Sequence, residues 1–187
     1  MVFLHIDTKN YNVKDDNGET PIQILNKFIS SGKNVFALIY MEGCGPCNAT
    51  RPEWGKIKHV LKKDAKSSND FLVVDIDKDL LSKVKNIGIS PRGFPTIRFI
   101  SNNGKNTEDF EDCKLNKEYK NRTIDSFIKW IHLKINEKQK HIIKKNHRKT
   151  RKQKGGKWSV KYKRSINCKR PNGFSQKQYC KYSRRKH

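Results

Sequence analysis

Acidic residues are absent from the last fifty positions of this 187-residue chain, although the whole chain contains 18 of them. Residues 138–187 hold 20 Lys and Arg and carry +20, whereas residues 1–137 hold 22 Lys and Arg against 18 acids and carry +4. A segment charged in this way repels itself and resists collapse. This excludes an ordinary solvated helix face and points to a polyanionic partner: nucleic acid, an anionic membrane surface or an acidic protein.

Long hydrophobic runs are also missing. No stretch approaches the roughly 18–20 apolar residues of a membrane-spanning helix, which argues against a transmembrane segment. The first sixteen residues turn polar early, unlike a secretory signal peptide. We therefore expect an intracellular protein in a reducing compartment such as the cytoplasm, where cysteines more often serve catalysis than structural bridging.

Two of the five cysteines stand in the sequence Cys44-Gly45-Pro46-Cys47, which two residues separate from an apolar run that ends at residue 41. A helical pattern begins near Asn48, so the pair lies at a strand-to-helix junction. A helix N-terminus offers unpaired backbone N–H groups and the positive end of the macrodipole, and both favour a thiolate. Cys44 is therefore expected to be the attacking thiol. Cys47, about one turn further on, is expected to be more buried and close enough to pair with it.

The same cysteines could instead be half of a zinc site, or a coincidence. Zinc usually takes four ligands, as two such pairs or as one pair plus histidines. The sequence has no second Cys-x-x-Cys, and Cys113, Cys168 and Cys180 are not suitably spaced. Redox chemistry is therefore the preferred interpretation, and it needs no metal or organic cofactor.

These residues resemble the thioredoxin family, whose active-site tetrapeptide is Cys-Gly-Pro-Cys. Pro52 falls where that family has a helix-kinking proline. Residues 93–97, Gly-Phe-Pro-Thr-Ile, resemble the family's loop with a cis-proline, although the sequence alone also allows an ordinary trans-proline. The resemblance implies that Pro95 is cis and faces the cysteines. It also implies a set of substrate-binding residues: Gly45, Pro46, Phe94, Pro95 and Thr96.

The order of the expected elements supports the resemblance. Strands are expected at residues 2–6, 35–41 and 71–77, with a hairpin of 96–101 and 107–110 around Asn103-Gly104. Helices are expected after Thr20, near Asn48 and after Thr123, with a short one at 80–84. This order predicts an α/β protein with the thioredoxin fold, a mixed central sheet flanked by helices, over residues 1–137. Residues 138–187 are expected to form a basic, partly disordered C-terminal tail, whose first part continues the preceding helix.

Two positions depart from the family pattern. Gly43 stands where the family usually has a tryptophan that contacts substrate. Leu38 stands where the family often has a buried acid that helps to deprotonate the second cysteine. Glu42 is nearby but is expected to point to solvent. Because both sulfur atoms remain, the resemblance still implies a thiol-disulfide oxidoreductase acting on protein disulfides or dithiols.

Aromatic side chains are interleaved with the cations of the tail, and Trp158, Tyr162 and Tyr179 are examples. Aromatic rings can stack on bases while Lys and Arg neutralise phosphates, so the tail could contact nucleic acid. Protein docking or packaging, a solvated tail and a small packed module remain open.

Residues 165–182 resemble a basic C-terminal motif appended to diverse proteins of large cytoplasmic DNA viruses. That resemblance implies a viral protein, located in the host cytoplasm or carried in the virion. It also provides a second hypothesis, in which a polyanion-binding packaging protein uses a thioredoxin-like domain chiefly as a scaffold.

Cys168 and Cys180 lie within this motif. They could pair as a disulfide across a turn at Asn172-Gly173. They could instead bind zinc together with His147 or His187, although their spacing matches no strong zinc pattern.

Overall fold

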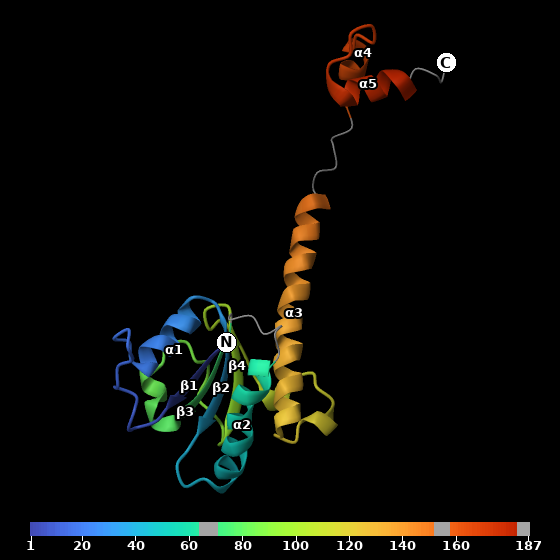
Figure 1. Cartoon of the computed structure of the whole chain (residues 1–187). Coiled ribbons are helices and arrows are strands. Elements are labelled where there is room, and N and C mark those ends of the chain that lie inside the picture. Colours follow the sequence, from blue (N-terminus) through green and yellow to red (C-terminus); the bar gives the residue numbers. More distant parts are fainter. Residues whose placement is uncertain (64–70, 152–157, 183–187) are drawn as a thin grey trace. The chain divides into compact units, whose positions relative to one another are not determined.

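The computed structural model describes residues 1–63, 71–151 and 158–182, and for residues 138–151 the helical backbone alone. The chain divides into two units, Met1–His141 and Ile142–His187, and each is described by itself. The elements from the start of the chain to the long helix α3 are, in order (Figure 1), β1 (Val2–Ile6), α1 (Pro21–Ser30), β2 (Asn34–Tyr40), α2 (Gly45–Lys63), β3 (Phe71–Asp77), the 3-10 helix η1 (Lys78–Lys83), β4 (Thr96–Ser101), β5 (Asn106–Asp109), the 3-10 helices η2 (Phe110–Asp112) and η3 (Lys117–Tyr119), and α3 (Ile124–Arg151).

The five strands form one mixed sheet in the order β1-β3-β2-β4-β5. Strands β1, β3 and β2 are parallel, whereas β4 runs antiparallel to β2 and β5 antiparallel to β4. Strand β2 lies in the middle and every one of its residues is buried. This explains why its sequence is almost continuously apolar rather than alternating. The predicted mixed sheet and hairpin are confirmed.

Helices cover both faces of the sheet. Helix α1 and η1 pack on one face, and α2 and α3 pack on the other (Figure 1). The second face is rich in aromatic rings that meet edge to face, with centroids 5.1–5.6 Å apart: Phe36, Trp54, Phe110, Phe127 and Trp130. Such geometry adds to the energy of burial itself. The two cores hold the central strand, and with it the start of α2, in a fixed position.

Local signals set where the helices begin. Helix α1 begins after Thr20, as the sequence predicts, with Pro21 in its first turn. Thr20 and Gln23 also form a capping box. The short helix expected at 80–84 is instead a 3-10 helix that starts at Lys78. It begins earlier because the Asp77 side chain accepts a hydrogen bond from the Asp79 N–H at 3.0 Å. Helix α2 also begins before the expected Asn48, at Gly45.

One buried cation fastens the hairpin to the loop that precedes β4. Arg98 is 2% exposed, and its Nε and Nη2 donate to the two carboxylate oxygens of Asp109 at 2.6 and 3.1 Å. Its Nη1 donates to the carbonyl oxygens of Ile87 at 3.3 Å and Ile89 at 2.5 Å. The guanidinium therefore links β4, β5 and the loop through charge-assisted bonds.

We predict that Asp109→Ala lowers the free energy of unfolding by about 3 kcal/mol, because it leaves the buried Arg98 charge uncompensated. Urea unfolding measures the change. Asp112→Ala is the matched control, because Asp112 is exposed, and it should shift stability by no more than about 0.5 kcal/mol. Equal effects of the two substitutions would contradict the role given to the buried pair.

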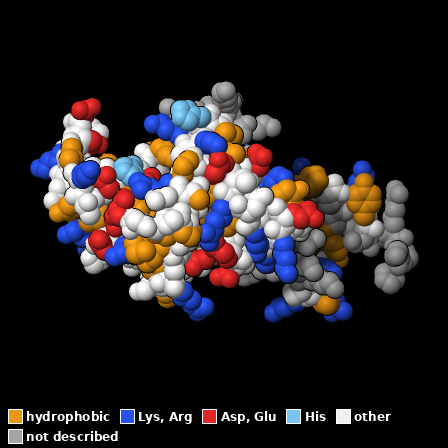
Figure 2. Space-filling model, turned by 90° about the horizontal axis from the view of Figure 1, so that it is seen from below, with side chains coloured by type: hydrophobic (Ala, Val, Ile, Leu, Met, Phe, Trp, Pro, Cys, Tyr) orange, Lys and Arg blue, Asp and Glu red, His pale blue; other side chains and the backbone are white. Residues whose placement is uncertain are grey.

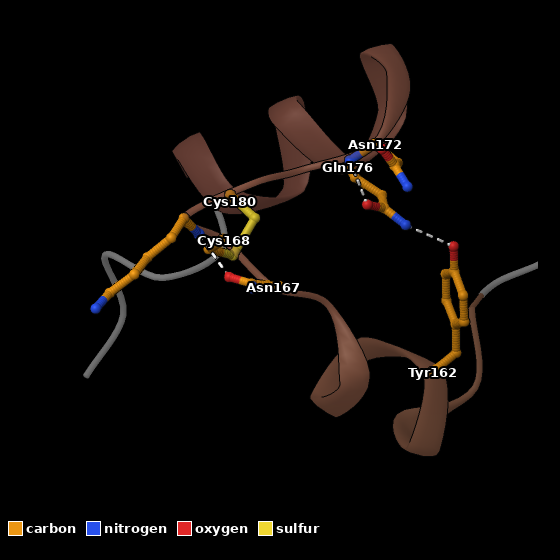
Figure 3. The surroundings of a disulfide bond; sticks show 7 residues. Tyr162, Asn167, Cys168, Asn172, Gln176 and Cys180 are labelled. Carbon is orange, nitrogen blue, oxygen red and sulfur yellow. Dashed lines mark hydrogen bonds between the residues drawn. A yellow bond between two sulfur atoms is a disulfide. The ribbon is translucent and has the colours of Figure 1, made fainter.

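The second unit contains the last two helices, α4 (Val160–Ser165) and α5 (Gly173–Tyr182). A disulfide joins Cys168 to Cys180 (Figure 3), so of the two alternatives for these cysteines the structure has the disulfide. At the expected turn, Gly173 has a left-handed φ of +71° and the Asn172 N–H donates to the Gln176 side chain at 2.7 Å. The side chains of His147 and His187 lie outside the described residues.

Within residues 158–182 no side chain is fully buried. The contacts there are rings and amides: Trp158 lies 5.0 Å from Tyr162 and 5.8 Å from Tyr179 between centroids, and Gln176 donates to the Tyr162 hydroxyl at 2.8 Å. The disulfide closes a loop between residues 12 apart, which stabilises the folded form by about 3 kcal/mol in the chain-entropy account. Among the described helices, none is long and apolar enough to cross a membrane.

Candidate redox site

A tight turn joins the end of β2 to the start of α2. The Cys44 N–H donates to the Met41 carbonyl at 3.4 Å, and Gly43, the third residue of the turn, has a φ of +74°. A left-handed residue at this position favours glycine, and a tryptophan there would be strained. A Cβ added to Gly43 would meet no atom of the described residues within 4 Å. The departure from the family pattern thus suits the conformation of this turn.

The sulfur of Cys44 caps helix α2. Its Sγ accepts a hydrogen bond from the Cys47 N–H at 3.3 Å, and its carbonyl accepts from the Asn48 N–H at 3.0 Å. Pro46, between them, has no N–H to offer. The cap explains why α2 starts at Gly45. The positive end of the helix dipole therefore lies at the Cys44 sulfur.

A second segment, fifty residues further along the chain, meets Cys44. The Phe94–Pro95 peptide bond is cis, as the resemblance implied. In its thiol form Cys44 donates to the Phe94 carbonyl at 3.6 Å. The Thr96 hydroxyl donates to the Gly93 carbonyl at 2.7 Å and holds the loop in shape. The structure therefore brings the cysteine pair and the proline loop together.

The two cysteines differ in exposure. Cys44 is 9% exposed and Cys47 is 0% exposed, so the predicted greater burial of Cys47 is confirmed. Around them, Gly45 and Pro46 are exposed and Phe94 is half-buried, whereas the side chains of Pro95 and Thr96 are buried. An incoming group can thus reach Gly45, Pro46 and Phe94. The buried side chains of Pro95 and Thr96 set the shape of the loop.

Cys47 sits in an apolar cluster with Cys44 and Tyr40. Burial raises the pKa of the Cys47 thiol, and the adjacent Cys44 sulfur raises it further; a backbone hydrogen bond from Met41 and the charge of Arg122 oppose this. At the family's acid position, Leu38 is fully buried. On the neighbouring strand, the Asp75 carboxylate is in register with Leu38 and is hydrogen-bonded to His5 Nδ1 at 2.5 Å.

Sequence reasoning missed two residues beside the cysteines, Tyr40 and Arg51. Tyr40 is fully buried, its hydroxyl has no partner among the described residues, and burial raises its pKa. The Arg51 guanidinium lies 4.0 Å from the centre of the Tyr40 ring and also pairs with Glu42 at 3.2 Å. Glu42 is 66% exposed, as expected. Tyr40 belongs to the apolar run of β2, so its sequence context does not distinguish it from a core residue. Nothing in the local sequence marks Arg51 as its neighbour.

Elsewhere, acidic and basic side chains are mixed over the face drawn in Figure 2, in keeping with the near balance of charge in residues 1–137. Cys113 is 3% exposed within the aromatic core. Across the described part of the chain, no three side chains of the types His, Cys, Asp or Glu gather in a way that could hold a metal ion.

The sequence profile of the thioredoxin family matches residues 19–128, more than half of the chain. The chain therefore belongs to the thioredoxin family, and its mixed sheet flanked by helices is the thioredoxin fold. A comparison with curated protein sequences finds no match.

Among solved structures, the J-Trx1 fragment of ERdj5 is similar with 12% identity over 72% of this chain and 52% of that chain, at a TM-score of 0.46. Zinc-bound human ERp44 has 15% identity over 71% of this chain and 31% of that chain, at 0.44. The first thioredoxin domain of mouse protein disulfide-isomerase A4 has 19% identity over 66% and 69%, at 0.38. This chain thus spans about half of the ERdj5 fragment and under a third of the ERp44 chain.

We predict that iodoacetamide labels Cys44 before Cys47 and Cys113 in the reduced protein near neutral pH. Of these three thiols Cys44 has the largest exposed fraction, 9% against 0% for Cys47 and 3% for Cys113, and its sulfur accepts the helix hydrogen bond. The initial rate at Cys44 should exceed the others by at least about tenfold, measured by peptide mass spectrometry. Faster labelling of Cys47 would reverse the assignment of the two thiols.

Proposed function

We propose that the protein is a thiol-disulfide oxidoreductase that uses the Cys44–Cys47 dithiol-disulfide couple on protein disulfides or dithiols. The observation that carries the proposal is the placement of Cys44 Sγ, which accepts the Cys47 N–H at 3.3 Å and lies 3.6 Å from the Phe94 carbonyl beside cis-Pro95. Thioredoxin-family membership supports the same chemistry at a general level. The reaction requires no metal or organic cofactor.

In the reductive direction, the Cys44 thiolate attacks one sulfur of a substrate disulfide. A mixed disulfide forms, and the other substrate sulfur leaves as a thiolate and takes up a proton. Cys47 then loses its proton to solvent and attacks Cys44 Sγ. The Cys44–Cys47 disulfide forms and the second substrate sulfur leaves. The reverse sequence oxidises a substrate dithiol, and the direction follows the relative reduction potentials.

Substrate binding falls to the open edge of the site. Gly45, Pro46 and Phe94 are reachable and would contact the chain on either side of the substrate sulfur. Pro95 and Thr96 would act through the backbone of the loop they shape. An extended peptide could pair with that backbone, because strand addition uses exposed main-chain groups.

We predict that Cys44→Ser abolishes insulin disulfide reduction, whereas Cys47→Ser blocks turnover but accumulates mixed disulfides. Without the resolving thiol, the intermediate on Cys44 cannot discharge internally. Non-reducing gels of the Cys47→Ser protein should show adducts that dithiothreitol removes. Cys113→Ser is the matched control and should retain activity. Reduction of insulin by the Cys44→Ser protein, or an absence of adducts, would refute the two-cysteine mechanism.

We also predict that the resolving step accelerates with pH. Burial holds the pKa of Cys47 above its ordinary value of 9.0, so its thiolate fraction rises about tenfold per pH unit between about pH 7 and 8.5. The decay of a preformed mixed disulfide on Cys44, followed by acid quenching and mass spectrometry, should show this slope. A flat rate would reveal an internal proton acceptor that replaces the family's acid.

A second role is proposed for residues 138–187, namely the binding of a polyanion that locates or packages the protein. Its support is the +20 charge without one acid, together with exposed aromatic side chains such as Phe174 at 76% and Tyr182 at 62%. The resemblance of residues 165–182 to a motif of large cytoplasmic DNA viruses makes packaging in a virion the natural form of this role. The thioredoxin-like domain would then act in the host cytoplasm or travel with the particle.

We predict that the full chain binds duplex DNA far more tightly than residues 1–137, while both reduce insulin. Each phosphate contact contributes a log–log salt slope of about −0.9, so six contacts would cost roughly a thousandfold between about 50 and 200 mM salt. Fluorescence anisotropy across this salt range measures the slope. Equal binding by the two chains would refute the role of the tail, and a folded but inactive truncation would place the tail in the catalytic unit.

A further inference from the structure

The described residues 158–182, here called the C-terminal module, fold with little support beyond their disulfide. The module carries seven Lys and Arg and no acid, and none of its side chains is fully buried. Its side-chain contacts include the ring contacts of Trp158 with Tyr162 and Tyr179. They also include the hydrogen bonds of Gln176 with Asn172 and Tyr162 (Figure 3). Like charges oppose the folded form, so the Cys168–Cys180 bond is a main source of the module's stability.

The fold of the module in turn affects how easily its disulfide is reduced. Where reduction unfolds a module, the fold protects the disulfide only by the net stability of the oxidised, folded form, because the two equilibria are linked. The module gains little from burial, so its fold gives the Cys168–Cys180 bond little protection against reduction. Disulfides that are exposed and weakly supported are the labile ones and accept electrons readily.

The two sulfur atoms are also suited to exchange. Cys168 and Cys180 are each partly exposed. Lys169 follows Cys168 and Lys181 follows Cys180, while Lys177 lies one turn before Cys180 on α5. Positive charge near a sulfur stabilises the thiolate that leaves, which speeds attack on its partner.

Gly43, next to Cys44, carries no side chain that could stand against a substrate. Among the described residues no atom lies within 4 Å of where its Cβ would be. In the structure Cys44 and Cys47 are free thiols, whereas Cys168 and Cys180 form the disulfide. One chain thus contains a dithiol suited to donating electrons and a disulfide suited to accepting them.

We propose that the Cys168–Cys180 disulfide is a substrate of the Cys44–Cys47 couple of a second copy of this chain, and that its reduction unfolds the C-terminal module. The inference rests on the proposed oxidoreductase function and names one substrate class for it: small basic modules closed by a single disulfide.

The exchange balances without another reactant. Cys44 of one copy attacks Cys168 or Cys180 of the other, the module disulfide breaks, and the departing sulfur takes up a proton. Cys47 gives up its proton, attacks Cys44 and releases the second module sulfur, which is protonated in turn. Two electrons pass to the module, and the Cys44–Cys47 disulfide forms.

The experiment mixes two full-length chains. The donor carries Cys168→Ser and Cys180→Ser and is reduced, and the recipient carries Cys44→Ser and Cys47→Ser with its module disulfide intact. Differential alkylation and mass spectrometry follow free thiols at Cys168 and Cys180. The donor should reduce the recipient at least about tenfold faster than a matched donor that also carries Cys44→Ser. A donor with Cys47→Ser should yield a peptide that links Cys44 to Cys168 or Cys180.

Insulin reduction by the same donor separates this inference from the function on which it rests. A donor that reduces insulin but not the recipient overturns the inference and leaves the proposed function in place. A donor that reduces neither overturns both. Reduction of the recipient at the rate of the Cys44→Ser donor also overturns the inference.

Amide hydrogen exchange on the full-length recipient tests the structural consequence. Protection in α4 and α5 should fall to the level of an unfolded segment after reduction, while β2 and β3 keep theirs. Unchanged protection in α5 would show that the module folds without the disulfide, and would overturn the proposed switch.

Discussion

The hydrogen bond from the Cys47 N–H to Cys44 Sγ is the interaction on which the site depends. It makes one sulfur the cap of α2 and places the other one turn inside the helix. The cap holds only because the turn before it is tight, and the left-handed Gly43 makes that turn. The Cys44 sulfur faces the Phe94 carbonyl only because two packed cores fix β2 and β4 side by side. The chemistry of the pair is thus set by the geometry of the helix start.

Burial gives the two sulfurs different tasks. Cys44 remains slightly exposed at the helix end, while Cys47 is enclosed with Tyr40 and has a raised pKa. Leu38 stands at the family's acid position, Asp75 on the neighbouring strand is engaged by His5, and the positive charge of Arg122 opposes the rise in the pKa of Cys47. Gly43 stands where the family usually has a tryptophan. The local sequence thus departs from the family pattern close to both cysteines.

Much of the fold could be predicted because its signals are local. The capping box at Thr20, the continuous apolar run of β2 and the turn at Asn103-Gly104 each mark an element where it occurs. The start of α2 was placed too late because a cysteine is not an expected cap. Tyr40 and Arg51 were missed because their contact joins a strand to the helix after it. Helices α4 and α5 were also missed, since they bury no apolar face and so leave no periodic pattern.

The central claim, that Cys44 and Cys47 form one reversible couple, is tested most directly by a redox titration of the full chain. Thiols are alkylated at each potential, and the mass of the peptide that contains both cysteines is measured by mass spectrometry. The account predicts that both become reactive together in a single two-electron transition at about −270 mV, the value typical of thioredoxin. Cysteines that titrate independently, or that stay reduced at every potential up to that of the oxidised buffer, would contradict it.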